Sequence, residues 1–216
     1  MNTVRTVVLM SLVAFCISPG QTFEGTITFA ISSPRGTQAM TYHTKGDQVR
    51  IDMERAPGMT MSVLMNTTSK DVTMLMPQNK MYMQMNLNTM PVPPDMNDQD
   101  ADFKKTGKKE TILGYVCEQV VISQENREVE MWVTKGLGKF VQANLNPRAQ
   151  SPLMKKLEKE LTDQGYFPLR TVARAADGSE EMKMEATSID KKPLDDNLFV
   201  IPADYQLMQM PPPPQR

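Results

Sequence analysis

The sequence predicts an α+β fold: a curved antiparallel β-sheet with a pair of helices covering its concave face. Two patterns support this fold class. Short segments of alternating apolar and polar residues follow one another and share one apolar phase, so the same side of each strand faces the core. A helical pattern then interrupts the strands before two more strands follow, as is typical of α+β proteins. The chain has 216 residues, enough for one domain with a substantial core.

Strand-like segments fill the first part of the chain, and Gly, Pro, Asn and Asp separate them. The expected strands are residues 23–31, 39–45, 48–54, 59–66, 71–76 and 80–86. Pro77–Asn79 and Lys80 have good turn chemistry, with Pro at the first central position. If these four residues form the loop of a hairpin, Met76 lies opposite Met81 and Met74 lies opposite Met83.

The later strands and helices are less regular. Residues 89–103 are rich in Pro and Asp, and we expect a mobile loop there. Strands follow at 115–123 and 128–134, and a short helix is expected at about 137–145. A longer helix is expected over residues 151–165. Ser151 can cap it, Pro152 suits its first turn, and Gly165 suits its end. Two final strands, 167–176 and 180–190, are joined by an Asp-Gly turn.

The first residues are typical of a secretory signal peptide. Arg5 supplies the positive charge, residues 6–17 form a short apolar stretch, and small residues lead to a cleavage site after Gly20. A lipid-modified Cys16 is disfavoured because the bulky Phe15 precedes it. We therefore expect an exported protein, periplasmic or extracellular. Its signal peptide is residues 1–20, its single domain residues 21–208, and its disordered, Pro-rich tail residues 209–216. No apolar run is long enough to span a bilayer as a helix.

Composition and motifs exclude several classes of function. The net charge is −1, and removing residues 1–20 leaves 23 basic and 25 acidic residues, or −2, with no basic excess for nucleic acid. The only histidine is His43, and the only cysteine after cleavage is Cys117. No nucleophile elbow, phosphate loop, zinc motif or dinucleotide fingerprint is present. We expect a protein that is not an enzyme and needs no cofactor, with His43 on a polar strand face and Cys117 as a small core filler.

Methionine is the compositional outlier, with 20 residues. Many of the methionines alternate along the expected strands, so they line one face of the sheet. We considered three interpretations of this face. It is an ordinary packed core, a pliable apolar wall for a lipid or acyl chain, or an envelope Cu(I) site in which Met81, Met83 and Met85 supply soft thioether ligands.

Four stretches resemble the domain of unknown function 4412 family of bacterial envelope proteins. They are residues 106–119 (TGKKETILGYVCEQ), 128–140 (EVEMWVTKGLGKF), 157–170 (LEKELTDQGYFPLR) and 194–206 (LDDNLFVIPADYQ). That family is in turn similar to the LolA/LolB lipoprotein carriers. This resemblance implies an open half-barrel whose concave apolar face is covered by helices and binds acyl chains. It implies no catalytic residues.

The residues and the resemblance together favour a binder of a hydrophobic ligand, a lipid or another apolar small molecule. The copper site and a purely structural or interaction domain are the alternatives. The expected ligand wall consists of methionines on the strands and two leucines on the helix above them. These residues are Met61, Met65, Met74, Met76, Met81, Met83, Met85, Leu157 and Leu161.

Overall fold

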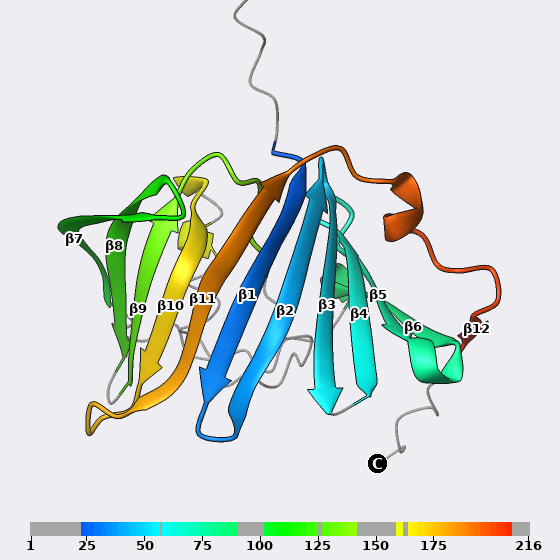
Figure 1. Ribbon diagram of the computed structural model, residues 1–216, viewed down its shortest axis with the longest axis horizontal. Helices are drawn as coiled ribbons and strands as arrows, with labels where there is room; N and C mark the ends of the chain where they lie inside the picture. The colour runs from blue at the N-terminus through cyan, green and yellow to red at the C-terminus, as the bar shows by residue number, and fades with distance from the viewer. Residues whose placement is uncertain are drawn as a thin grey trace, which may run out of the picture.

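The computed structural model is a single curved sheet of 12 strands (Figure 1). It describes residues 23–56, 58–89, 102–124, 127–141, 159–161 and 164–208. The strands are β1 (Gly25–Ser33), β2 (Gly36–Lys45), β3 (Gln48–Ala56), β4 (Met59–Asn66), β5 (Asp71–Met76), β6 (Met81–Asn86), β7 (Asp102–Ile112), β8 (Tyr115–Gln124), β9 (Arg127–Thr134), β10 (Phe167–Arg174), β11 (Glu180–Lys191) and β12 (Gln206–Leu207).

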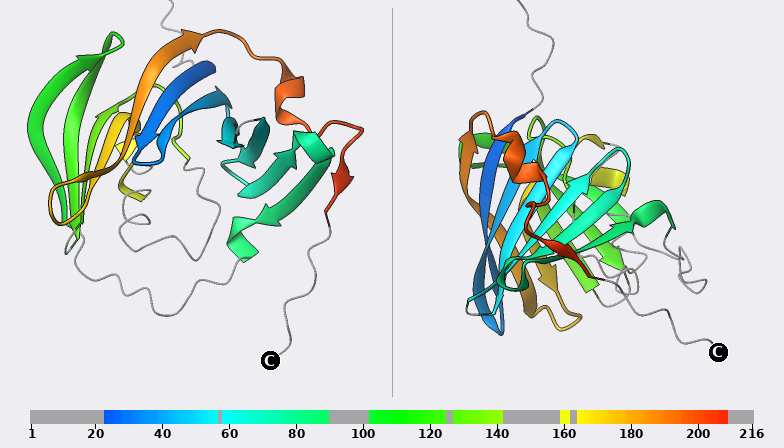
Figure 2. Two further views of the ribbon diagram at one scale, coloured as in Figure 1. Left: turned by 60° about the horizontal axis from the view of Figure 1, so that its bottom comes forward. Right: turned by 90° about the vertical axis from the view of Figure 1, so that its right-hand side faces the viewer.

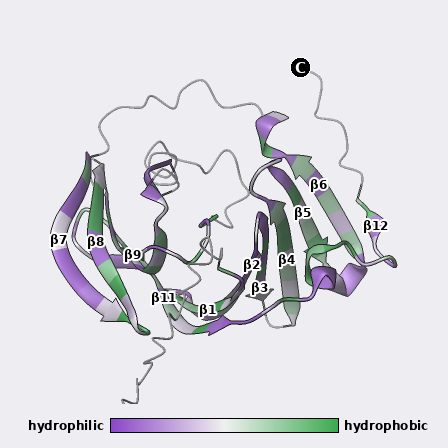
Figure 3. Ribbon diagram, turned by 90° about the horizontal axis from the view of Figure 1, so that it is seen from above, coloured by the Kyte–Doolittle hydropathy of each residue, from purple (hydrophilic) through white to green (hydrophobic). Residues whose placement is uncertain are grey.

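The sheet consists of two antiparallel meanders that meet at its centre. Its strand order is β12-β6-β5-β4-β3-β2-β1-β11-β10-β9-β8-β7. Strands β1–β6 pair in chain order, as do β7–β11, and β1 pairs with β11 to join the two groups. Seen from above, the sheet curves so that β7–β9 and β4–β6 lie at opposite ends of an open arc (Figure 3). The expected curved antiparallel sheet is therefore confirmed.

The first six strands confirm the sequence prediction and its register. Met76 pairs with Met81 and Met74 with Met83. Between β5 and β6, Pro77–Asn79 forms a 3-10 turn, and Lys80 closes it in the left-handed conformation with a φ of 49°. The apolar phase of these strands is continuous because alternate residues of an extended chain point to the same face.

The expected pair of helices is not observed. Of the residues that the structure describes, only 159–161 and 164 are α-helical. Residues 137–141, where a short helix was expected to begin, have no regular secondary structure. Residues 142–158 lie outside the described residues, as do the expected signal peptide and the expected Pro-rich tail. The described part of the protein is mostly β. Gly136 and Gly138 have φ values of 85° and 84°, which are incompatible with a right-handed helix at those positions.

Two of the observed strands, β7 and β12, were not predicted from the sequence. The expected mobile loop at 89–103 overlaps the start of β7 at Asp102, which pairs with β8, and residues 90–101 of that loop lie outside the described residues. β7 is rich in lysine and lies at the edge of the sheet, where charged residues discourage further pairing, so it lacks the apolar alternation of an internal strand. β12 has only two residues and pairs with β6 in parallel.

The core lies on the concave side of the sheet. Ile27 and Phe29 of β1 are fully buried there, as are Tyr42 of β2 and Phe167 of β10. Three aromatic rings form a compact group at the centre, where Phe140 stacks on Tyr42 with centroids 6.1 Å apart and Phe167 meets both rings edge-on at 5.4 Å. This group fixes the middle of the concave face.

The opposite, convex face carries the polar residues of the alternating strands, but part of it is covered. Residues 194–208, called the C-terminal strap from here on, run along the outside of β3–β6 and end beside β6 (Figure 2). The strap contains the 3-10 helix η4 (Asp196–Phe199) and β12. Leu64 and Leu75 on the convex face are 7% and 2% exposed. The strap explains why these strands carry apolar residues on both faces.

Candidate ligand-binding face

Cross-strand pairing arranges the concave face of β2–β6 into three rows. The first row begins with the pairs Met40–Met53 and Met53–Met61. The second row crosses Tyr42, Ile51, Val63, Met74 and Met83. The third row crosses Thr44, Val49, Met65, Val72 and Met85. Methionine thus becomes more frequent toward the β5–β6 end of the sheet.

Exposure changes in the same direction. On β4, Met61 and Met65 are 9% and 5% exposed. On β5 and β6 the five methionines of this face, Met74, Met76, Met81, Met83 and Met85, are all partly exposed. Met74 and Met85 still pack against the main core cluster. The methionines of this wall are therefore buried on β4, near the centre of the sheet, and accessible on β5 and β6, near its end.

The seven methionines expected in the ligand wall all lie on this face, on three neighbouring strands. Leu161 does not join them. It is 1% exposed and packs in a second apolar cluster on β8 and β9, with Val120, Ile122 and Tyr166. Leu157, the other expected helix residue, lies outside the described residues. The methionines and Leu161 therefore occupy opposite ends of the curved sheet.

Charged groups accompany the second cluster. The Tyr166 hydroxyl donates to Glu118 Oε2 at 3.0 Å, and this bond is the largest cause of a lowered pKa for the Glu118 carboxyl. The ammonium groups of Lys105 and Lys135 lie 5.2 and 5.1 Å from the centroid of the Tyr166 ring, within the range of cation–π attraction. This end of the concave side is therefore more polar than the methionine-rich end.

Residues 135–141 are held on the concave side by Tyr42. Its hydroxyl donates to Lys139 O at 2.8 Å and accepts a hydrogen bond from the Val141 N–H at 3.0 Å. Leu137, fully buried in the main core cluster, anchors the same segment. Burial raises the pKa of the Tyr42 hydroxyl well above its ordinary value, so the hydroxyl remains a donor at any physiological pH.

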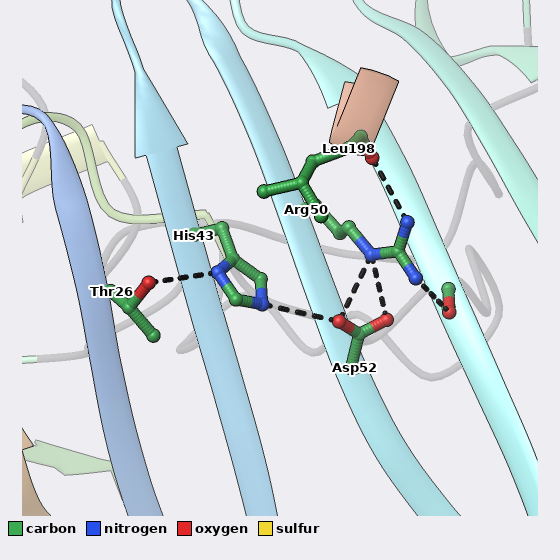
Figure 4. A network of polar contacts seen from close by, with 6 residues as sticks. Thr26, His43, Arg50, Asp52 and Leu198 are labelled. Atoms are coloured by element: carbon green, nitrogen blue, oxygen red, sulfur yellow. Dashed lines mark hydrogen bonds and ion pairs between the residues drawn. The ribbon is translucent and has the colours of Figure 1, made fainter. Parts of the chain in front are cut away.

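A polar network occupies the convex face under the strap (Figure 4). His43 Nε2 lies 3.2 Å from Asp52 Oδ2, and His43 Nδ1 lies 2.9 Å from Thr26 Oγ1. Arg50 Nε donates to both oxygens of Asp52 at 2.9 Å, and Arg50 Nη1 donates to Leu198 O of the strap at 3.0 Å. Burial alone would raise the pKa of Asp52, but hydrogen bonds from His43, Arg50 and Ser62 outweigh it and hold the pKa at about 2.

Thr26, His43 and Asp52 form a hydrogen-bonded chain like the nucleophile, base and acid of a hydrolase triad. Their surroundings differ from those of a hydrolase active site. Arg50 already neutralises the Asp52 carboxylate. Thr26 lies within β1, which pairs with strands on both sides, so its backbone N–H groups serve the ladder and do not form an oxyanion hole. The network connects β1, β2 and β3 to the strap, which fits a structural role. His43 lies on the polar strand face, as expected.

Two further features bear on chemistry. Cys117 is fully buried in β8, and this burial is the main cause of a raised pKa for its thiol, which fits the expected role as a core filler. Among the described residues, no group of three or more His, Cys, Asp or Glu side chains could hold a metal ion. The described helical residues include no stretch that is long and apolar enough to cross a membrane.

An open curved sheet with an apolar concave wall defines a mostly β protein with a half-barrel architecture. The chain belongs to the family described as Domain of unknown function (DUF4412), which matches residues 23–205. No curated protein matches the sequence significantly. The family therefore confirms the resemblance found in the sequence, and it assigns no activity.

Solved structures share the fold at low sequence identity. PNGF-II in space group C2 is 21% identical over 86% of this chain, with a TM-score of 0.51, but this chain spans only 30% of PNGF-II. An uncharacterized conserved protein from Thermus thermophilus is 10% identical, with 86% of this chain and 90% of that chain covered and a TM-score of 0.53. A chain of the Pseudomonas aeruginosa MucA/MucB complex is 11% identical, with coverages of 88% and 62% and a TM-score of 0.51. These similarities concern the fold alone.

Proposed function

We propose that this protein is a non-enzymatic binder of a hydrophobic ligand, with a lipid acyl chain as the ligand class. The observation that carries the proposal is the accessible end of the concave wall, where five partly exposed methionines lie side by side on β5 and β6. Burying an apolar side chain contributes about 1.5–3 kcal/mol, so a sheet face that leaves five of them partly exposed has free energy to gain from an apolar ligand.

Methionine suits an acyl chain for a physical reason. Its unbranched side chain has three rotatable bonds and a polarizable sulfur, so a wall of methionines can repack around chains of different length. Such a wall binds mainly by burying apolar surface, and we therefore expect weak chemical selectivity. The similar open-sheet structures support a binding or carrier fold, and the acyl-chain ligand is our proposal.

Met83→Asp is the central test, because it puts a charge in the second row of the wall. A fluorescent fatty-acid probe should bind the wild type, and the variant should lose this binding at least tenfold, since burying an unpaired carboxylate is costly. Gln84→Asp is the matched control. Gln84 is the next residue on β6, exposed and on the opposite face, so the same charge there should leave binding unchanged.

Two measurements keep the test independent of misfolding. Binding is normalised to folded protein by circular dichroism, and Met83→Phe provides a second variant that fills space without adding charge. Native purification followed by solvent extraction and mass spectrometry identifies any bound lipid. The proposal is abandoned if folded wild-type protein carries no lipid and binds no probe, because the methionine face is then an ordinary core.

We also propose that the protein acts outside the cytoplasm, in the periplasm or the extracellular space. The signal-like residues 1–20 motivate this location. N-terminal sequencing of the mature protein should begin at Gln21. If the mature chain instead begins at a lipid-modified Cys16, the predicted cleavage after Gly20 is wrong and the protein is anchored to a membrane by its lipid.

A further inference from the structure

The first row of the concave face consists entirely of methionine. Cross-strand pairs join Met40 to Met53, Met53 to Met61, and Met76 to Met81. The antiparallel register of β4 and β5, continued by one residue beyond its last pair, places Met61 opposite Met76. These five residues, one from each of five adjacent strands, are called the methionine row.

The turn after β5 supports this register. The Gln78 side-chain amide donates to Gly58 O and to Thr60 Oγ1, both at 3.1 Å. The chain that follows Met76 therefore runs beside the start of β4. Since Thr60 immediately precedes Met61, the two methionines lie next to each other across the two strands.

The composition of the row is not what a simple sheet core requires. The adjacent second row uses Tyr42, Ile51 and Val63 on β2, β3 and β4, residue types that pack well on a pleated surface. Methionine specifies packing less well, because it has more rotatable bonds. Five thioethers in register are therefore better explained by a property of sulfur than by volume alone.

The relevant property is affinity for soft metal ions. Thioether sulfur is a soft, neutral ligand that selects Cu(I) over hard cations. Directly opposed residues on neighbouring strands have Cβ atoms about 4.5–5.5 Å apart, whereas side chains two apart on one strand are separated by roughly 6.5–7 Å. Flexible side chains can bring three sulfurs together more easily across strands than along one strand. The row thus suits a metal better than Met81, Met83 and Met85 of β6.

We propose that Met53, Met61 and Met76 form a Cu(I) site at the centre of the methionine row. Met61 is 9% exposed and supplies a buried ligand. Met53 and Met76 flank it and are partly exposed, so the ion can enter from solvent. Neutral thioethers leave the positive charge of the ion uncompensated, and the site therefore holds Cu(I) reversibly and suits transfer of the ion to another protein. This site shares Met61 and Met76 with the wall proposed for the acyl chain, but leucine substitutions remove the sulfur and keep that wall apolar, so copper binding and acyl-chain binding can be tested separately.

The experiment is an anaerobic titration of the full chain with Cu(I) against a chromophoric Cu(I) chelator, repeated with Ag(I) as a redox-inert probe. Wild-type protein should withdraw one equivalent from the chelator. A triple variant, Met53→Leu with Met61→Leu and Met76→Leu, should bind at least tenfold more weakly. Leucine keeps much of the apolar volume and removes the sulfur, and circular dichroism checks that the variant is folded.

A matched control removes the same number of thioethers from the same face. Met65→Leu, Met74→Leu and Met83→Leu lie in the second and third rows, and this variant should keep the wild-type affinity. The single variant Met76→Leu, at a partly exposed position, guards against misfolding of the triple variant and should also weaken binding. The proposal is overturned if the wild type takes no Cu(I), or if the control loses as much affinity as the row variant.

Discussion

Tyr42→Phe removes one oxygen atom from the middle of the protein, and the structure allows its cost to be calculated. The ring is fully buried and contacts Phe140 and Phe167, and phenylalanine keeps all of that packing. The variant loses the hydrogen bond to Lys139 O and the bond from the Val141 N–H. The change therefore isolates the polar attachment of residues 135–141 to the concave face.

Each lost bond contributes differently. The Lys139 carbonyl belongs to an exposed residue and can turn to water, so we assign the net value of about 1 kcal/mol to its bond. Val141 is buried, and leaving its N–H without a partner costs about 1–3 kcal/mol. The total is about 3 kcal/mol. For a domain of this size, each kcal/mol shifts the melting temperature by roughly 2–4 °C, so the variant should melt roughly 6–12 °C lower.

Thermal and urea unfolding followed by circular dichroism measure this difference. Tyr205→Phe is the control, because Tyr205 is partly exposed and water can replace any bond that it loses. Its melting temperature should stay close to the wild-type value. An equally small shift for Tyr42→Phe would refute the reasoning, since residues 135–141 would then be held by apolar contacts alone.

Two further predictions concern the convex network and the start of β1. The pKa of Asp52 is lowered to about 2 in the folded protein, so its stabilising effect is complete above the unfolded pKa and is lost as the pH falls from about 4 to 2. Asp52→Asn should therefore lower the melting temperature at pH 7, and the two proteins should converge near pH 2. Gly25→Ala should lower the free energy of unfolding by about 1–3 kcal/mol, because its methyl group would collide with the Asp190 carbonyl. Gly178→Ala meets nothing within 4 Å, so by denaturant titration it should show no steric collision and cost only the backbone strain of its φ of 80°, about 1 kcal/mol.

The first six strands could be predicted because their signal is local. Alternation along each segment sets which residues share a face, and the loop at Pro77–Asn79 sets the register of β5 and β6. The shared apolar face and the pairs Met76–Met81 and Met74–Met83 follow from these two features. The complete methionine row did not follow, because it depends on the joint register of five strands, and the copper site considered from the sequence used only methionines two apart on β6.

The position of the strap could not be predicted from the sequence for a different reason. The strap stays in place through long-range contacts: Lys45 Nζ lies 2.7 Å from Asp196 Oδ1, and Lys80 Nζ lies 2.9 Å from Asp204 Oδ2. Contacts between residues so far apart in sequence have no local pattern. One signal was available, because Leu64 and Leu75 break the polar phase of β4 and β5. Apolar residues on both faces of a strand indicate that something covers both faces.

The central pairing of β1 with β11 has a consequence for how the chain folds. This seam joins Gly25 to Lys191, almost the full length of the described chain, whereas every other antiparallel pair joins strands that follow each other in sequence. Each meander can therefore form early from local hairpins, and the seam must close late, after a large loss of chain entropy. Until β11 arrives, β1 presents an open edge flanked by Ile27 and Phe29, which can pair with another copy of the chain. The rate of seam closure therefore sets the competition between folding and aggregation.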